Sequence, residues 1–184
     1  MTIGITINLE DGVLLIADGR QISPFLNGQP VLNSDANKIH QITPTIAAIT
    51  FGIGHATKIA LQILSDNIDP TSSPHEICQL MDFSVETSWK YLTQMFSPDV
   101  DITHEAMIAG LMIGGVARNT PFISQALHDD KGKKPSMVET EPYGCLFLGG
   151  IDQQASQIFN AKAKHMFDRP HAVARPRTTE EIIN

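Results

Sequence analysis

Thr2 is the residue whose type and position offer this chain the most chemistry. It follows the initiator methionine and heads the alternating run Thr2-Ile3-Gly4-Ile5-Thr6-Ile7-Asn8-Leu9. Its small side chain permits removal of Met1, which would leave a hydroxyl nucleophile and a free α-amino group on one residue. That amine has an ordinary pKa of about 7.7–8.0, so it can act as the base that an isolated hydroxyl lacks. We therefore interpret Thr2 as a candidate N-terminal nucleophile.

Length and composition predict one globular domain that could position such a residue. The chain has 184 residues, of which 42% are hydrophobic, enough for a full core. Its net charge of −7 disfavours nucleic acid and anionic membranes as partners, because phosphate binding draws on clustered Lys and Arg. Cys78 and Cys145 lack C-x-x-C spacing, which suits reduced thiols. Because the amino terminus lacks the pattern of a signal peptide, we expect a cytoplasmic location.

The N-terminal part of the sequence has the pattern of antiparallel strands. Four apolar runs are separated by turn residues: 2–9, 13–17, 38–42 and 46–51. Glu10-Asp11-Gly12 between the first two runs predicts a hairpin with a tight turn. Residues 22–36 are rich in Pro, Asn, Gly and Ser, which predicts a loop. Strands joined by such short connections favour an antiparallel sheet.

After Gly52-Ile53-Gly54 the apolar spacing changes to the period of a helix. One helix begins near His55, and Ser73-Pro74-His75-Glu76 is a capping box that opens a longer helix reaching to about Phe96. Residues 129–142 are polar and predict a loop. The remaining apolar runs predict three strands and a final helix at 106–116, 122–127, 143–148 and beyond Gly149-Gly150. Strand runs followed by a helix pair indicate an α+β fold.

Four short motifs lie at the boundaries of these elements: Thr2 at the head of the first strand, Ala17-Asp18-Gly19-Arg20 after the second, Asn37-Lys38-Ile39 opening the next pair, and Phe51-Gly52 ahead of a helix. In this order they resemble the proteasome β-subunit family of N-terminal-nucleophile threonine peptidases. The resemblance implies the N-terminal-nucleophile hydrolase fold, in which antiparallel β-sheets are sandwiched between helix layers. It would make residues 1–184 one domain that lacks C-terminal elements of the family.

The resemblance also implies a role for four residues. Thr2 matches the nucleophile, Asp18 and Lys38 match an aspartate and the lysine it pairs with, and Gly52 matches the glycine whose N–H forms the oxyanion hole. A lysine near the terminal amine favours its neutral form, because a nearby positive charge disfavours a second one. The aspartate would hold the lysine charged and oriented. One oxyanion-hole donor is typically worth about 2.7–4 kcal/mol.

Partners follow from the same resemblance. It implies self-association into rings, with interfaces that use the two helices, cleavage of unfolded polypeptides, and an ATP-driven AAA+ unfoldase as a partner. It implies no cofactor. We expect no metal either, because His165 and His171 lie near a helix end without a matching Asp, Glu or Cys at ligand spacing, and His75 sits in a capping box.

Other functions remain open. Gly150 stands where the family has a serine that helps to position the terminal amine, and the chain ends at Asn184. These features are compatible with a catalytically degenerate, ring-forming homologue or with an amidohydrolase of small amides. A nucleotide-binding α/β domain is a further alternative, because Gly52-Ile53-Gly54-His55-Ala56-Thr57 follows a strand and opens a helix. Thr57 at the third glycine position and hairpin-linked strands argue against it.

Overall fold

Antiparallel sheets and two long helices make up the part of the chain that the structure describes. This computed structural model describes residues 3–19, 21–26, 29–33, 36–69, 71–95, 108–129, 132–142 and 144–149. Within these ranges the fold is α+β, as the sequence predicts, with three sheets that contain three, two and five strands.

The three-stranded sheet holds the first hairpin. Its strands are β1 (Ile3–Asn8), β2 (Val13–Ala17) and β10 (Cys145–Gly149), in the order β10-β1-β2. The Leu9 N–H donates to the Gly12 carbonyl at 2.8 Å, which closes the turn between β1 and β2. This confirms the hairpin that the Asp-Gly sequence predicts.

The five-stranded sheet forms the centre of the molecule in the order β5-β6-β7-β8-β9. All of its strand pairs are antiparallel. Its strands are β5 (Ile39–Thr43), β6 (Ile46–Gly52), β7 (Ile108–Ala117), β8 (Thr120–Asp129) and β9 (Gly132–Glu139).

Residues 22–36 are not a loop, contrary to the sequence prediction. They contain β3 (Gln21–Leu26) and β4 (Gln29–Asn33), which pair with each other as a separate hairpin. Pro24 and Pro30 misled the prediction, because proline cannot donate to a strand ladder. A two-stranded ribbon tolerates proline, since each strand has an outer edge that needs no partner, and the register shifts between Ser23 and Leu26. The Asn-Gly sequence between the strands is a hairpin signal that the composition concealed.

The predicted loop at 129–142 was also wrong for most of its length, because β9 occupies Gly132–Glu139. The strand is polar because it is the outermost strand of its sheet. Edge strands commonly carry lysine and proline, which discourage pairing with another chain. Lys133, Lys134 and Pro135 supply both residue types here.

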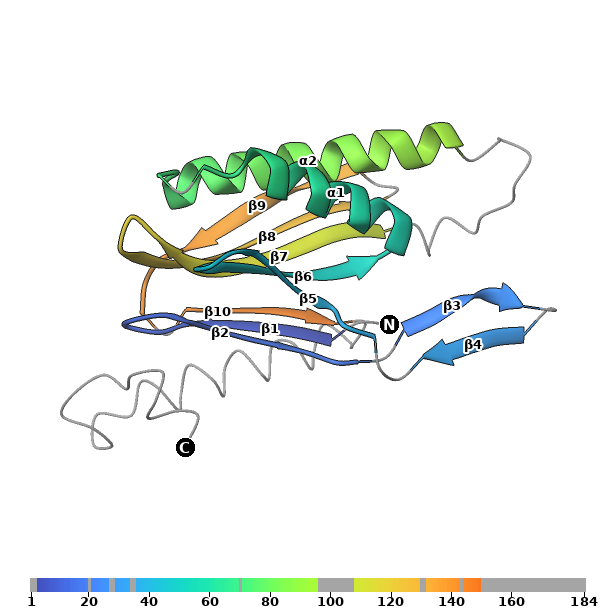
Figure 1. Cartoon of the computed structure of the whole chain (residues 1–184), viewed down its shortest axis with the longest axis horizontal. Helices are drawn as coiled ribbons and strands as arrows, with labels where there is room; N and C mark the ends of the chain where they lie inside the picture. The colour runs from blue at the N-terminus through green and yellow to red at the C-terminus, as the bar shows by residue number, and fades with distance from the viewer. Residues whose placement is uncertain are drawn as a thin grey trace.

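The helices cover one face of the five-stranded sheet (Figure 1). They are α1 (Gly54–Asn67) and α2 (Pro74–Met95). The predicted capping box is present at the start of α2: the Glu76 N–H donates to Ser73 Oγ, and the Ser73 N–H donates to the Glu76 carboxylate at 2.6 Å. These hydrogen bonds from Ser73 lower the pKa of Glu76. The helices pack on the sheet through a core that includes Leu64, Ile77, Met81, Leu111, Ile113 and Phe122.

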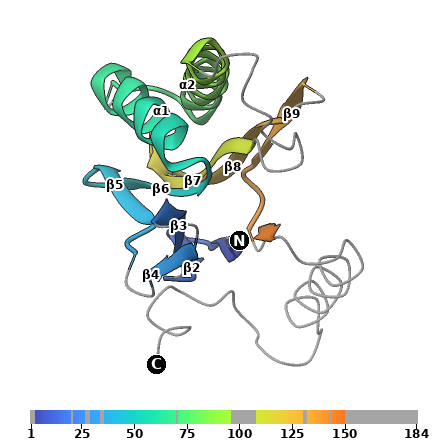
Figure 2. The ribbon, with the colours of Figure 1, turned by 90° about the vertical axis from the view of Figure 1, so that its right-hand side faces the viewer.

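The opposite face of the same sheet packs against the three-stranded sheet, as the turned view in Figure 2 shows. This second core contains Ile49, Phe51, Met112, Ile123 and Leu146. Alternation along each strand sends successive residues into the two cores, so Met112 lies in one and Ile113 in the other. The described residues therefore form three layers, in the order helices, large sheet, small sheet.

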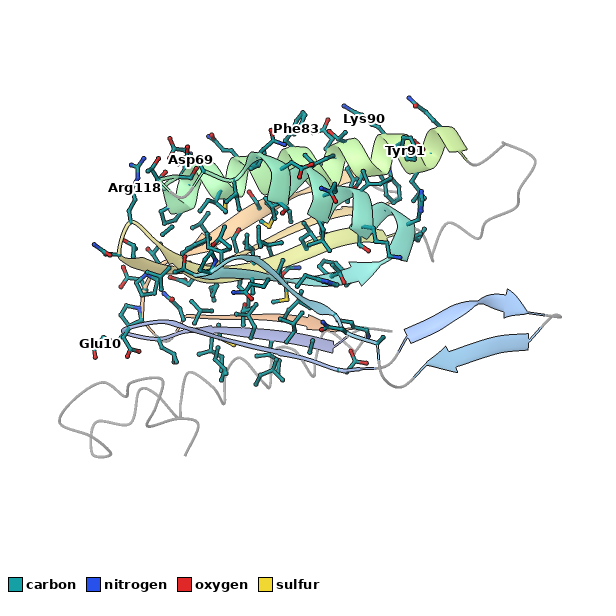
Figure 3. The ribbon with its side chains drawn as sticks, in the orientation of Figure 1. Glu10, Asp69, Phe83, Lys90, Tyr91 and Arg118 are labelled. Carbon is teal, nitrogen blue, oxygen red and sulfur yellow. The ribbon has the colours of Figure 1, made fainter. Side chains whose placement is uncertain are left out.

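The outer side of α2 carries Phe83 and Lys90, which point away from the sheet (Figure 3), and the Tyr91 ring lies 6.3 Å from the His55 ring of α1. The same figure places Arg118 beside Asp69 at one end of the helix layer. Arg118, in the turn between β7 and β8, donates from Nε to the Thr71 carbonyl and pairs with Glu76 at 3.4 Å. This contact ties the connection between the helices to the sheet.

Three expectations about the ends of the fold stay predictions. The helix predicted after Gly150, and with it a helix layer on the outer face of the small sheet, falls outside the described residues. So does the extent of the single domain over 1–184. Of the helices in the described ranges, neither has the length and hydropathy needed to cross a membrane.

Truncating the helix-side core should destabilise the protein. Met81 is completely buried, and Phe83, two residues away on α2, is 59% exposed. We expect Met81→Ala to lower the free energy of unfolding by about 2–5 kcal/mol. Phe83→Ala should change it by no more than about 0.5 kcal/mol. Urea unfolding followed by circular dichroism measures both, and equal losses in the two variants would contradict the assignment of the core.

Candidate active site

Asp18 and Lys38 form an ion pair that joins the small sheet to the large sheet. The Lys38 Nζ lies 2.9 Å from Asp18 Oδ1, and the two side chains are 9% and 25% exposed. Asp18 directly follows β2 of the small sheet, and Lys38 directly precedes β5 of the large sheet. A lysine at this depth requires an anion within hydrogen-bonding distance, because burial of an isolated charge costs several kcal/mol. The structure therefore brings together the two residues that the sequence places 20 positions apart.

Backbone hydrogen bonds on both sides hold this pair in place. The Ala36 N–H donates to the Gly19 carbonyl at 2.9 Å, so the chain leaves β2 and returns to the same point after the β3–β4 hairpin. The Asn37 side chain accepts from the Ile39 N–H at 3.2 Å, which fixes the turn into β5. The Lys38 carbonyl accepts from the Thr50 N–H at 3.1 Å, which ties Lys38 to β6.

Gly52 lies at the same end of the large sheet. It is the last residue of β6, two positions beyond Thr50, and it is exposed. Its φ of +93° is in the left-handed region, which glycine adopts without the steric cost that a Cβ would add. α1 begins two residues later, at Gly54. The glycine thus makes the sharp change from strand to helix and leaves the backbone accessible at this end of the sheet.

The start of β1 reaches this end of the molecule as well. Gly4 pairs with Ala17 in the register of β1 and β2, which brings Ile3 next to Asp18. Thr2, the predicted nucleophile, and Gly150, the predicted substitute for a serine, lie outside the described residues. Of the four predicted site residues, the structure therefore gathers Asp18, Lys38 and Gly52 at one end of the sheets, and the chain enters β1 from that end.

His40 is a neighbour of the site that the sequence reasoning did not identify. Its Nε2 lies 3.5 Å from Thr50 Oγ1, and Thr50 is the residue that hydrogen-bonds to the Lys38 backbone. Burial lowers the pKa of His40 below its ordinary value of 6.5, because desolvation disfavours the imidazolium. The available signal was its position, two residues after Lys38 in a strand, where alternate residues share a face.

Neither the two cysteines nor the metal-ligating side chains form a second candidate site in the described part of the chain. Burial raises the pKa of both Cys78 and Cys145 to about 11, so little thiolate forms at neutral pH. Across the described ranges, three or more His, Cys, Asp or Glu side chains gather nowhere in a way that could hold a metal ion.

The strand directions in the described residues do not fit the nucleotide-binding alternative. It needs parallel strands joined by a crossover helix, with the phosphates at the turn between strand and helix. The strand pairs in the described residues are all antiparallel, including β6 with β7, the strands that flank the helix pair. The Gly52-Ile53-Gly54 sequence therefore opens a helix without the surroundings of a dinucleotide site.

Comparisons with known proteins identify a similar fold. The chain is similar to the solved structure of a Gly-1 mutant of Anbu from Hyphomicrobium sp. strain MC1, with a TM-score of 0.58 and 12% sequence identity. The match covers 100% of this chain and 71% of the Anbu chain. No family model and no curated protein match the sequence. At this identity the likeness concerns the fold alone.

The family assignment from the sequence was wrong. We identified a resemblance to the proteasome β-subunit family, but no family model matches the chain and the structural likeness is to Anbu. The motifs behind the assignment lie at strand ends, where a turn, a charge or a glycine serves the fold itself. They therefore identify a fold more readily than a family. The AAA+ unfoldase partner and the cytoplasmic location stay predictions.

A double-mutant cycle tests the ion pair. Asp18→Asn removes the anion from a buried lysine, and Lys38→Met replaces that lysine by an uncharged chain of similar length. We expect each single variant to lower the free energy of unfolding by about 1–3 kcal/mol. The double variant should lose less stability than the sum of the two single losses, with a coupling of at least about 0.5 kcal/mol, because it leaves neither charge of the pair without its partner. Strictly additive losses in urea unfolding would show that the pair is not coupled.

His40 should make stability depend on pH. Its folded pKa is below 6.5, so between these two values the unfolded chain binds more protons than the folded chain. The contribution is fully present above about pH 6.5 and declines as the pH falls toward the folded pKa. Thermal unfolding of the wild type and of His40→Gln between pH 7.5 and 5 checks this. The wild type should lose more stability on acidification than the variant, and parallel curves would contradict the prediction.

Proposed function

We propose that this protein is an N-terminal-nucleophile hydrolase that cleaves peptide bonds with Thr2 as its nucleophile. The observation that carries the proposal is the buried Asp18–Lys38 ion pair at the end of the sheets where β1 begins. Ile3, the first residue of β1, directly follows Thr2 in the chain. The similar fold of Anbu supports the hydrolase class.

The reaction would use the main-chain amine of Thr2 as the base. After removal of Met1, this amine accepts the proton of the Thr2 hydroxyl while Oγ1 attacks the carbonyl carbon of the scissile amide. The tetrahedral intermediate then expels the amine leaving group, which receives the proton. An ester to Thr2 remains, and water hydrolyses it with the same amine as base. The free enzyme and the carboxylic acid product result.

Lys38 and Gly52 would lower the barrier through electrostatics. The ammonium of Lys38 stabilises negative charge on Oγ1 and disfavours protonation of the nearby terminal amine at rest. Asp18 keeps that ammonium in one orientation. The Gly52 N–H is the proposed donor to the oxyanion, and removal of such a donor typically slows a reaction by about 10²–10³-fold.

A polypeptide is the substrate that suits this site best. The site sits at the ends of strands β2, β5 and β6, next to the outer edge of β5. An extended chain can pair with a strand edge and present its amide groups in regular order. We also propose that the protein self-associates, which would enclose such sites and limit their access to unfolded chains.

The activity test needs three variants. Purified wild-type protein is incubated with fluorogenic peptides and, separately, with a β-lactone that acylates hydroxyl nucleophiles. We expect peptide hydrolysis and one acyl adduct on Thr2, with Met1 absent by intact mass spectrometry. Thr2→Ala should abolish both signals, and Asp18→Asn should reduce hydrolysis. Thr6→Ala is the matched control because Thr6 is fully buried in β1, and it should keep the adduct.

Three outcomes would overturn the proposal. They are an intact Met1, unchanged turnover in Thr2→Ala, and an adduct on a different residue. Turnover of small amides without any turnover of peptides would support the amidohydrolase alternative instead. A wild type that forms the adduct but turns over no substrate would be a degenerate homologue.

A further inference from the structure

Asn8, the last residue of β1, is a polar side chain in a completely buried position. A Cβ on Gly4, four residues earlier on the same face of the strand, would lie 3.3 Å from Ile49 Cγ2 of β6, so this face of β1 packs toward the large sheet. The Asn8 amide oxygen has no hydrogen-bond partner in the part of the chain that the structure describes. A buried acceptor without a partner destabilises a fold, and an apolar residue of similar size would avoid that loss.

The amide nitrogen of Asn8 holds the connection that leads into β10. Nδ2 donates to the Glu141 carbonyl at 3.0 Å, and the Asn8 N–H donates to the Gly144 carbonyl at 2.8 Å. The Gly144 N–H in turn donates to the Glu141 carbonyl at 3.1 Å, and the Glu139 carboxylate accepts from the Glu141 N–H at 2.8 Å. One side chain thus joins the end of β1 to the turn that precedes the neighbouring strand.

The register between β1 and β10 has no short turn to set it. The β1–β2 register follows from the tight turn that Leu9 and Gly12 close, whereas Asn8 and Glu141 are 133 residues apart. The apolar pattern specifies the β1–β10 register weakly as well, because β10 begins Cys-Leu-Phe-Leu and β1 repeats isoleucine at every second position. A shift by two residues, about 6.6–6.8 Å, would keep each side chain on its own face of the sheet.

We infer that Asn8 is a positioning residue that sets the register in which β10 pairs with β1. The hydrogen bond from Nδ2 to the Glu141 carbonyl favours one register, because a two-residue shift of β10 carries the turn before it away from Asn8. The buried asparagine lowers stability through its unpartnered oxygen and excludes the other pairings in return. A single buried asparagine fixes the register of coiled coils by the same balance.

The register decides which residues of β10 flank the start of β1. Gly149 lies opposite Ile3, the residue that directly follows Thr2 in the chain. The shift that moves Cys145 from its place opposite Ile7 to a place opposite Ile5 would set a phenylalanine, Phe147, in the place of that glycine. The consequence of this shift for catalysis rests on the proposed function, whereas the role of Asn8 in the register does not.

The native Cys145 reports the register. It lies opposite Ile7, so Ile7→Cys should form a disulfide with it, and Ile5→Cys should form little. Burial raises the pKa of Cys145 to about 11, which slows the reaction, so the full chain is brought to equilibrium in a glutathione buffer. Mass spectrometry of the digested protein gives the two yields. With Asn8 present, we expect position 7 to be favoured at least about tenfold over position 5.

The test places each cysteine variant in two further backgrounds. Asn8→Leu removes the amide and keeps the size of the side chain, and it should lower the preference for position 7 at least about threefold. Thr6→Val is the matched control, because Thr6 is equally buried on the same face and its hydroxyl has no partner among the described residues. It should leave the preference unchanged. Far-ultraviolet circular dichroism establishes folding, and Asn8→Ala is used if Asn8→Leu does not fold.

Four outcomes would overturn the inference. They are equal yields at positions 5 and 7 with Asn8 present, an unchanged preference in Asn8→Leu, an equal loss of preference in Thr6→Val, and failure of both Asn8 variants to fold beside a folded Thr6→Val. The last would show that Asn8 is needed for the fold as a whole. None of these measurements requires peptidase activity, so a wild type that cleaves no peptide would contradict the proposed function alone.

Discussion

The buried ion pair between Asp18 and Lys38 is the contact on which the arrangement at this end of the molecule depends. It connects the end of β2 in the small sheet to the start of β5 in the large sheet, and it lies beside the Gly19–Ala36 hydrogen bond that closes the intervening hairpin. The Lys38 side chain is 9% exposed, and the Asp18 carboxylate at 2.9 Å offsets part of the cost of burying its charge. The same pair therefore ties the two sheets together at this end and provides a fixed charge close to the start of β1.

The two sheets can lie face to face because small residues are present where they meet. A Cβ on Gly114 of β7 would lie 2.6 Å from a methyl carbon of Val13 on β2, well inside the distance at which carbon atoms repel. On the other face of β7, Leu111 and Ile113 pack under the helices. β7 thus belongs to two cores at once, and Gly114 allows the small sheet to approach the large one closely at Val13.

Local pattern predicted most of the elements correctly and failed where strands lie at an edge. The β1–β2 turn, the β5–β6 pair, the capping box of α2 and the apolar stripe through Met81 follow from short-range rules of periodicity and hydrogen bonding. β3, β4 and β9 were missed because edge strands tolerate proline and carry polar side chains, which removes the composition that marks a buried strand. His40 was missed for a different reason. A histidine in a strand has no distinctive pattern until its distance to Thr50 is known.

The sequence by itself determined the α+β class, the boundaries of most elements and the residue types available for chemistry, because these depend on neighbours within a few positions. It did not determine the family, since turn and strand-end residues serve the fold in many proteins. Only the tertiary structure decided how closely Asp18 approaches Lys38, a pairing that the resemblance had implied, that Gly52 turns the chain at φ +93° at the same end of the sheets, and that β3 and β4 pair with each other. These features depend on contacts between sheets and on backbone closure across about 20 residues, where the free energy lies in pairing and burial and leaves no local pattern in the sequence.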